Sequence, residues 1–344
     1  VEESPDLILE MERIGALWQR EEDGETYSLR IDGGHSFHRC PFLEDRTGRE
    51  MSRTLFGEMN KRNIPVVSNV MILKILTQDG RVSGAVGVDL EHCEPDLFRS
   101  KSIVLACGGA GNLYLSTSNP TGVTGDGYAL ALQAGAALMD MEFVQFFPLG
   151  FLFPNSLRGA LGALLYHVHL RNSKYDPERL ELSTRDRVAR AIYTEINEGR
   201  GGPHGGIFAD MTYHEPGFIA KMQPALYETY CKIGIDPEKE YLEVAPTCHF
   251  FMGGVKVNEN WATTLPGLFA AGETAVGIHG GNRLSQNALA ELLVTGNRAG
   301  VSAAKYAQAN IQEHVNPAVV KEFETLVNGM FERNDGIRPS ALRT

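Results

Sequence analysis

A short apolar run that ends in a group of glycines constrains this chain most. Residues 102–106 read Ser-Ile-Val-Leu-Ala, and residues 107–111 continue as Cys-Gly-Gly-Ala-Gly. A strand without polar alternation belongs in a sheet that is covered on both faces, as in α/β proteins. Glycine after such a strand lets the backbone approach a ligand closely, because no Cβ atom stands in the way. The pattern predicts an α/β fold with a ligand-binding loop at the end of this strand.

Two further loops have a related composition. Residues 267–271 read Gly-Leu-Phe-Ala-Ala and predict a strand that ends at Gly272-Glu273, where a carboxylate can bind ribose or ribityl hydroxyls. Residues 124–127 read Thr-Gly-Asp-Gly at the start of a predicted helix, where N–H groups favour an anion such as a phosphate. Both acidic side chains also have simpler interpretations: Asp126 as a helix N-cap, and Glu273 as a solvated loop charge or a cap.

The order of the predicted elements indicates two lobes. We predict helices over residues 5–19, 48–62, 125–137, 286–299 and 303–328, and strands over residues 66–76, 82–90, 102–106, 254–257 and 267–271. Between about residue 148 and residue 246, charged helical segments such as 185–198 alternate with Gly/Pro loops, which is typical of a separate α+β lobe. A binding site between the lobes is the expectation for such an inserted arrangement.

Composition excludes several classes of function. The net charge of -11 argues against a nucleic-acid partner, because phosphate binding needs a concentrated basic surface. No run approaches the roughly 18 apolar residues of a membrane span. The five cysteines are scattered and form no Cys-x-x-Cys pair, so we expect no zinc or iron–sulfur site within this chain.

A histidine and an arginine, each beside glycines, mark a candidate substrate site. His249 precedes Phe-Phe-Met-Gly-Gly, and Arg283 follows His-Gly-Gly-Asn. Arginine binds a carboxylate through two parallel N–H donors, and histidine adds a donor that can carry a proton near neutral pH. The alternatives are a buried structural histidine and a structural ion-pair arginine.

Ordered motifs along nearly the whole chain carry a resemblance to a known family. They are Gly33-Gly34-His35-Ser36, Thr124-Gly125-Asp126-Gly127, Met-Glu-Phe-Val-Gln-Phe at 141–146, Arg-Asp-Arg-Val-Ala-Arg-Ala-Ile at 185–192, Thr-Cys-His-Phe-Phe-Met-Gly-Gly at 247–254, Phe-Ala-Ala-Gly-Glu at 269–273, His-Gly-Gly-Asn-Arg-Leu at 279–284 and Asn-Ala-Leu at 287–289. With them the chain resembles the flavoprotein subunit of succinate dehydrogenase and fumarate reductase. L-aspartate oxidase and the adenylylsulfate reductase flavoprotein are relatives of that family.

The resemblance implies an α/β fold with a partial FAD-binding, Rossmann-like domain and an inserted α+β capping domain. The FAD-binding domain would comprise residues 1–145 and 249–305, the capping domain residues 146–248, and the start of a C-terminal helical region residues 306–344. The first βαβ unit would be missing, since the chain contains no Gly-x-Gly-x-x-Gly and begins with Val1 rather than Met. We therefore expect a chain cut at both ends.

The resemblance also implies FAD as the cofactor and assigns residues to it. The expected cofactor-binding residues are Gly108, Gly109, Thr124, Asp126, Gly272, Glu273, Asn287, Ala288 and Leu289. The backbone at Ala288 and Leu289, at a helix start, would stabilise negative charge on the reduced flavin. His249 and Arg283 would bind the substrate carboxylates, and Arg158 would transfer the proton.

Two positions depart from the family pattern. Phe147-Pro148-Leu149 stands where the family has His-Pro-Thr, so an apolar ring replaces one substrate-binding histidine. Arg158-Gly159-Ala160-Leu161-Gly162 is the best counterpart of the family's Arg-Gly-Glu-Gly-Gly and lacks the acidic residue.

The implied activity is hydride transfer between FAD and a small dicarboxylate such as fumarate or succinate, with electrons exchanged with an iron–sulfur partner subunit. Two alternatives stay open. One is L-aspartate oxidase, and the other is a non-catalytic flavin-binding subunit of an electron-transfer complex, which Phe147 favours. We expect a cytoplasmic protein, or one held at the inner face of the membrane by its partner subunits.

Overall fold

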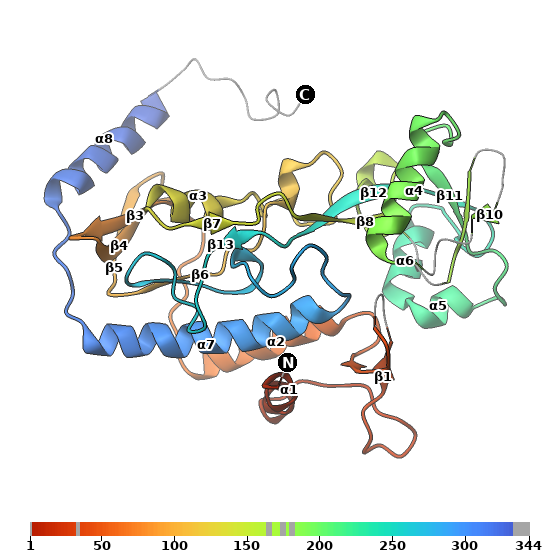
Figure 1. Ribbon diagram of the computed structural model, residues 1–344, viewed down its shortest axis with the longest axis horizontal. Coiled ribbons are helices and arrows are strands. Elements are labelled where there is room, and N and C mark those ends of the chain that lie inside the picture. Colours follow the sequence, from red (N-terminus) through yellow and green to blue (C-terminus); the bar gives the residue numbers. More distant parts are fainter. Residues whose placement is uncertain (1, 32–34, 163–166, 173–176, 179–182, 333–344) are drawn as a thin grey trace.

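The computed structural model describes residues 2–31, 35–162, 167–172, 177–178 and 183–332. Two lobes lie at opposite ends of its longest axis, as Figure 1 shows. Of the described residues, those up to 139 and those from 254 onward form one lobe, and the middle of the chain forms the other. This is the predicted order of sheet lobe, inserted lobe and return.

The first lobe contains the two glycine-terminated strands. β6 (Ile103–Leu105) and β14 (Leu268–Ala270) pair in parallel, which joins segments that are far apart in the sequence. An antiparallel sheet adds β3 (Val70–Gln78), β4 (Arg81–Asp89) and β5 (Pro95–Arg99), and two short pairs join β1 (Leu29–Arg30) to β2 (Cys40–Pro41) and β7 (Leu138–Met139) to β13 (Gly254–Val255). The predicted strand over 66–76 was placed too early, because Val66 and Val67 are exposed. Val104 is 37% exposed, so the described residues do not cover both faces of β6, contrary to our expectation.

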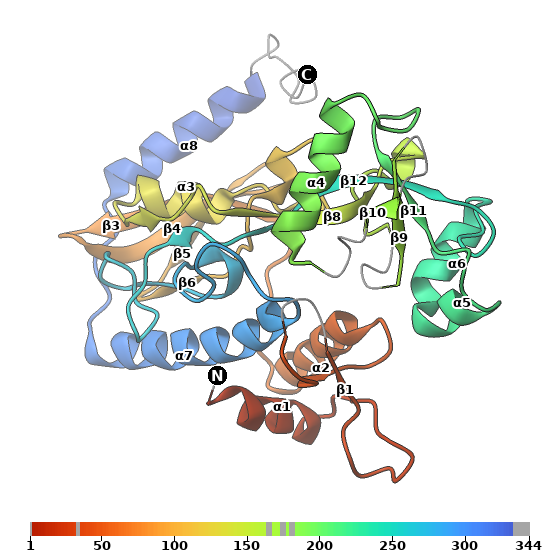
Figure 2. The same cartoon turned by 45° about the vertical axis from the view of Figure 1, so that its right-hand side comes forward.

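Five helices of the described part of the chain belong to this lobe. They are α1 (Ser4–Arg13), α2 (Thr47–Lys61), α3 (Asp126–Gln133), α7 (Asn287–Ala309) and α8 (Pro317–Glu332). Helices α1 and α2 lie on the same side of the molecule as α7, which is visible in Figure 2. Helix α8 packs on β4 and β5 through Phe323 and Val327.

Several predicted helix ends were wrong, and two of them have a clear physical cause. The first helix stops at Arg13 rather than continuing to residue 19, because Gly15 takes a left-handed φ of 104° and the Ala16 N–H donates back to the Met11 carbonyl. Helix α7 was expected to stop before Gly300 but continues to Ala309. Its buried stripe at four-residue spacing (Glu291, Thr295, Ala299, Ala303) keeps packing on the sheet past that glycine.

The second lobe is built on a five-stranded antiparallel sheet. Its strand order is β10 (Pro177–Glu178), β9 (His169–Arg171), β11 (Ile207–Asp210), β12 (Leu242–Phe251) and β8 (Val144–Phe151). Helix α4 (Arg185–Asn197) packs on β8 and β12, and α5 (Phe218–Met222) and α6 (Pro224–Lys232) complete the lobe. Its core includes Phe151, Leu149, Val188 and Ile192.

The long strands β8 and β12 connect the lobes and position the candidate site. Their pairing has register shifts between Ala245 and Thr247 and between Cys248 and Phe250. These irregularities bend the pair where it leaves the second lobe. Gln145, Phe147 and His249 therefore lie at the junction of the lobes.

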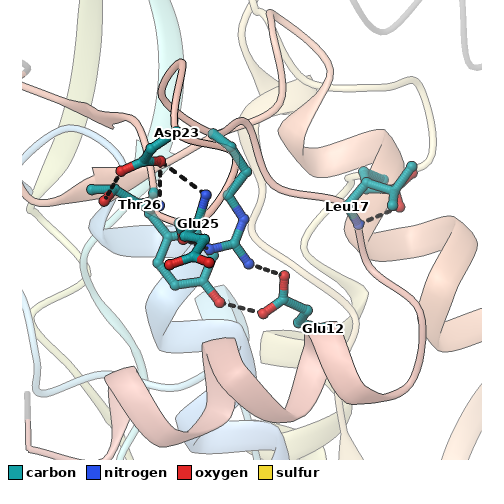
Figure 3. Close-up of polar contacts among 8 residues, drawn as sticks. Glu12, Leu17, Asp23, Glu25 and Thr26 are labelled. Carbon is teal, nitrogen blue, oxygen red and sulfur yellow. Dashed lines mark hydrogen bonds and ion pairs between the residues drawn. The ribbon is translucent and has the colours of Figure 1, made fainter.

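A polar cluster fastens α1 to the segment that follows it (Figure 3). Glu12 binds both Arg20 and Tyr27, and Asp23 accepts hydrogen bonds from the N–H groups of Glu25 and Thr26, each at 2.8 Å. The Leu17 N–H donates to Glu50 of α2 at 2.9 Å. These bonds satisfy the polar groups of a turn that would otherwise compete with the helix.

Candidate active site

Three loops predicted separately from glycine content meet in the structure. Gly108 has a φ of 72°, and its carbonyl accepts a hydrogen bond from the Thr274 hydroxyl at 3.0 Å. A Cβ atom on Gly109 would lie 2.2 Å from Oε1 of Glu273, so a larger residue there would displace the Glu273 carboxylate. The Gly125 N–H donates to the Gly109 carbonyl at 3.1 Å. The loop after β6, the start of α3 and the loop after β14 therefore form one surface.

Asp126 does not cap α3, contrary to one of its two interpretations. The residue before the helix is Gly125, with a φ of 86°, and Asp126 is the first helical residue. The Thr124 hydroxyl donates to its carboxylate at 2.5 Å. Asp126 is exposed and retains acceptor capacity toward a ligand beside this loop.

Glu273 lies in the short turn η3 (Gly272–Thr274) directly after β14. Its Oε1 accepts a hydrogen bond from the Phe251 N–H at 2.9 Å. Burial raises the pKa of Glu273 to about 7, and nearby Glu291 adds to the shift, whereas the Phe251 hydrogen bond and Arg283 oppose it. The simpler interpretation of Glu273 as a solvated loop charge is wrong.

This shift predicts a pH-dependent stability of the full-length apoprotein. The folded state binds more protons than the unfolded state between pH 4.5 and about 7, so the contribution of Glu273 to stability falls as pH rises through that window. The loss is up to about 3 kcal/mol, at about 1.4 kcal/mol per pKa unit. Urea unfolding on both sides of the window should show this fall in wild type and in Glu259→Gln, an exposed control, but not in Glu273→Gln. An identical pH dependence in Glu273→Gln would contradict the assignment.

The start of α7 faces a cavity of about 540 Å³. Asn287 and Leu289 are among its lining residues, together with Trp18, Tyr27 and Arg39 from the N-terminal segment. The volume lies in the range of ligand-binding pockets. Sequence reasoning did not find the contribution of the N-terminal segment.

The backbone at the start of α7 is only partly available to a ligand. The Leu289 N–H donates to the Gln286 carbonyl at 3.0 Å, and the Asn287 N–H to the Leu284 carbonyl at 3.4 Å. Within the part of the chain that the structure describes, the Ala288 N–H makes no such bond. Of Ala288 and Leu289, which were expected to face the flavin, Ala288 therefore offers the better backbone N–H donor.

The Gly-Gly-His-Ser motif is described only in part. Gly33 and Gly34 lie outside the described residues. The Arg39 Nε donates to His35 Nδ1 at 2.9 Å, so the His35 proton is on Nε2 and is donated to the Ser285 carbonyl at 2.7 Å. His35 thereby supports the loop between Arg283 and α7.

His249 lies at the bend of β12 beside the loop that follows β6. Its Nδ1 lies 2.7 Å from the Ser118 hydroxyl, and its carbonyl accepts a hydrogen bond from the Asn119 amide at 2.9 Å. Burial lowers the pKa of His249 to about 3, and the positive charges of Arg283 and Arg185 add to the shift. The imidazole is therefore neutral at neutral pH and acts as a hydrogen-bond donor rather than as a cation.

Arg283 is 6% exposed, and it is close enough to His249 for its charge to lower the pKa of that residue. Its guanidinium lies 4.4 Å from the centre of the Phe250 ring, a cation–π contact. Its carbonyl accepts a hydrogen bond from the Gln145 amide at 2.7 Å. The structure thus brings together the histidine and the arginine that sequence analysis predicted.

Arg185 is one residue of this site that sequence analysis missed. It is the first residue of α4, and one guanidinium nitrogen donates to the Ser285 hydroxyl at 2.8 Å. Another donates to the Gln145 side-chain oxygen at 3.4 Å, and the group lies 5.2 Å from the centre of the Phe147 ring. Sequence analysis noted the motif at 185–192, but the sequence alone does not show where the Arg185 side chain points.

Arg158, the predicted proton-transferring residue, lies elsewhere on the second lobe. Its side chain is exposed at the end of the short turn η2 (Asn155–Leu157). No hydrogen bond or ion pair of the described residues joins it to His249, Arg283 or Arg185. The geometry thus favours Arg185 over Arg158 as the arginine of the second lobe that reaches the site.

Comparison with known proteins decides the family. The family model of the FAD binding domain matches residues 1–289. The chain belongs to this family. The predicted α/β fold and FAD cofactor are thereby confirmed.

The relatives of the chain include flavoprotein subunits of fumarate reductases and succinate dehydrogenases. A subunit of the fumarate reductase (CoM/CoB) of Methanothermobacter marburgensis is 44% identical over 353 aligned residues, which cover 100% of this chain and 64% of the relative. A fumarate reductase flavoprotein subunit of Mycobacterium tuberculosis is 37% identical, with 92% and 58% covered. The chain therefore spans about three fifths of the length of these relatives.

Solved structures of proteins of this kind are also similar to the chain. A mutant of the E. coli quinol fumarate reductase superposes with a TM-score of 0.88 at 31% identity, covering 100% of this chain and 63% of that chain. The apo Sdh1 complex of Mycobacterium smegmatis gives a TM-score of 0.87 at 38% identity, with 99% and 61% covered. Among the described helices, none is both long and apolar enough to cross a membrane.

Proposed function

We propose that the full-length protein transfers a hydride between bound FAD and a small dicarboxylate of the fumarate/succinate type. The observation that carries this proposal is the meeting of His249, Arg283 and Arg185 at the junction of the two lobes. Both guanidinium groups lower the pKa of His249, and Gln145 bonds to Arg185 and to the backbone of Arg283. Two guanidinium charges beside a neutral imidazole complement the two negative charges of a dicarboxylate.

The residues present fit an FAD group. Glu273 and Asp126 offer acceptors for hydroxyls beside glycine loops, and the start of α7 offers the Ala288 N–H and the positive end of a helix dipole. When bound, FAD supplies a hydride acceptor or donor. The backbone could approach FAD closely at Gly108, Gly109 and Gly272, where no Cβ atom intervenes. FAD bound there would also lie beside Thr124 and Asn287.

The role that we propose for each side chain follows from its charge. His249 and Arg283 would hold the carboxylate groups. Reduction of a carbon–carbon double bond also requires a proton at the carbon that does not receive the hydride, and Arg185 would donate it. The second lobe, proposed as residues 146–248, would close over the substrate and exclude water.

The partners of the full-length protein are proposed by analogy with the relatives, which are named as subunits. We infer that an iron–sulfur partner protein exchanges electrons with the flavin. The protein would be cytoplasmic, or held at the inner face of the membrane by such partners.

Phe147 is expected to limit the affinity for fumarate. Its ring lies 5.7 Å from the His249 ring and replaces a hydrogen-bond donor of the family. The substitution Phe147→His should lower the KM for fumarate by about tenfold, the effect of one additional hydrogen bond to a charged group. Steady-state assays of the full-length protein check this, with Phe151→Leu as a control within the second lobe. An unchanged or higher KM would show that the ring does not border the carboxylate site.

The test of the proposed function is binding and turnover by full-length protein reconstituted with FAD. Succinate should perturb the spectrum of the oxidised flavin. Peroxide release on addition of aspartate would instead support L-aspartate oxidase. An unperturbed flavin across a panel of carboxylic acids, with a copurifying iron–sulfur protein, would support a non-catalytic electron-transfer subunit.

A further inference from the structure

We propose that Ser118 is a positioning residue that fixes the His249 imidazole as the tautomer with its proton on Nε2. Nε2–H is then the donor presented to the substrate carboxylate. This inference rests on the proposed function of the site.

The contact itself allows two arrangements. Ser118 Oγ and His249 Nδ1 lie 2.7 Å apart, which is a short hydrogen bond. Either the hydroxyl donates to an unprotonated Nδ1, or Nδ1–H donates to the hydroxyl oxygen. In the second case the hydroxyl proton must find another acceptor, and the candidate is the Cys248 carbonyl at 3.4 Å.

The Cys248 carbonyl is already occupied. It accepts hydrogen bonds from the Ser118 N–H at 2.9 Å and from the Thr117 hydroxyl at 3.1 Å. A carbonyl oxygen has two lone pairs, and these two donors use both. The Ser118 hydroxyl therefore gives its proton to Nδ1, and the single proton of the neutral ring is on Nε2. In the described part of the chain no hydrogen bond is made to His249 Nε2, so this donor remains for a ligand.

The backbone holds Ser118 in place relative to the ring. The Cys248 N–H donates to the Ser116 carbonyl at 2.9 Å, and the Asn119 amide donates to the His249 carbonyl at 2.9 Å. Together with the bonds to the Cys248 carbonyl, these contacts fasten residues 116–119 along the strand. The groups that face the imidazole from other elements, Arg283, Arg185 and the Phe147 ring, supply no acceptor that would compete for a proton on Nδ1.

Three variants distinguish a role of Ser118 in positioning the imidazole from a merely structural role. They are Ser118→Ala, Ser118→Thr and Ser116→Ala. Ser118→Thr keeps the hydroxyl. Ser116→Ala removes a hydroxyl from the same segment that binds Thr247 at 3.2 Å and does not contact the imidazole. All three are made in full-length, FAD-loaded protein, and His249→Gln identifies the His249 signal in nitrogen NMR of histidine-labelled protein.

Nitrogen NMR should show the Nε2–H tautomer of His249 in wild type, Ser118→Thr and Ser116→Ala, and a mixture of tautomers in Ser118→Ala. The affinity for succinate, read from the flavin spectrum, should fall about tenfold in Ser118→Ala only. An Nδ1–H tautomer in wild type, or an unchanged Nε2–H tautomer in Ser118→Ala, overturns the proposal. If wild type shows the Nε2–H tautomer but binds no succinate, the positioning role stands and the proposed function fails.

Discussion

Replacing Arg185 by glutamine in the full-length protein is expected to lower kcat for dicarboxylate reduction by about 10²–10⁴-fold, the range of a lost general acid. Arg185 is the one arginine of the second lobe whose described contacts reach the site, through Ser285 and Gln145. Glutamine keeps a donor for these contacts but cannot supply a proton. The measurement is steady-state reduction of fumarate with an artificial electron donor, after FAD content has been matched.

Arg158→Gln is the matched control. The Arg158 side chain is exposed and makes no described contact with His249 or Arg283, so kcat should stay within about twofold of wild type because no reacting group is removed. The reverse result, a large loss in Arg158→Gln and a small one in Arg185→Gln, would restore the assignment first made from sequence.

Replacing Arg283 by methionine is expected to weaken substrate binding by about 2–5 kcal/mol, which is about 30-fold or more in KM. Arg283 is 6% exposed, so solvent cannot replace the lost guanidinium beside a buried carboxylate. Methionine retains much of the aliphatic volume over the Phe250 ring. The measurement is KM for fumarate together with the succinate affinity of the oxidised flavin.

Arg298→Met is the control for this substitution. Arg298 lies on the outer part of α7 and pairs with Glu3 at the surface. It should leave KM unchanged, because surface ion pairs contribute little and Arg298 makes no described contact with His249 or Arg283. A normal KM in Arg283→Met would exclude Arg283 from carboxylate binding.

Sequence reasoning succeeded where local backbone chemistry decides the structure. Glycine is favoured at 108, 125 and 272 by a positive φ and at 109 by the close approach of the Glu273 side chain. The three loops that carry these glycines meet in the structure. Helix ends were less predictable. The end of α1 could have been read from Gly15, whereas the length of α7 depends on packing against β6 and β14, which overrides the low helix propensity of Gly296 and Gly300.

The site residues that sequence reasoning missed can be found only from the direction of their side chains in the folded structure. Arg185 and Arg190 lie in the same motif. Arg185 begins the helix and reaches Ser285 and Gln145, whereas Arg190 is exposed and pairs with Asp186. Ser118 gave no signal at all, since a serine in a polar loop has no distinguishing pattern. Phe147 was noted in the sequence as a departure from the family pattern, but only the structure shows its ring 5.7 Å from the His249 ring and 5.2 Å from the Arg185 guanidinium.

We propose that a hydride passes between flavin and a dicarboxylate held by His249, Arg283 and Arg185. The most direct measurement is anaerobic addition of fumarate to full-length protein whose flavin has been chemically reduced, followed by the flavin absorbance. We predict rapid return of the oxidised flavin spectrum with one succinate formed per flavin. A flavin that stays reduced in the presence of fumarate, in protein that binds FAD fully, would contradict the claim.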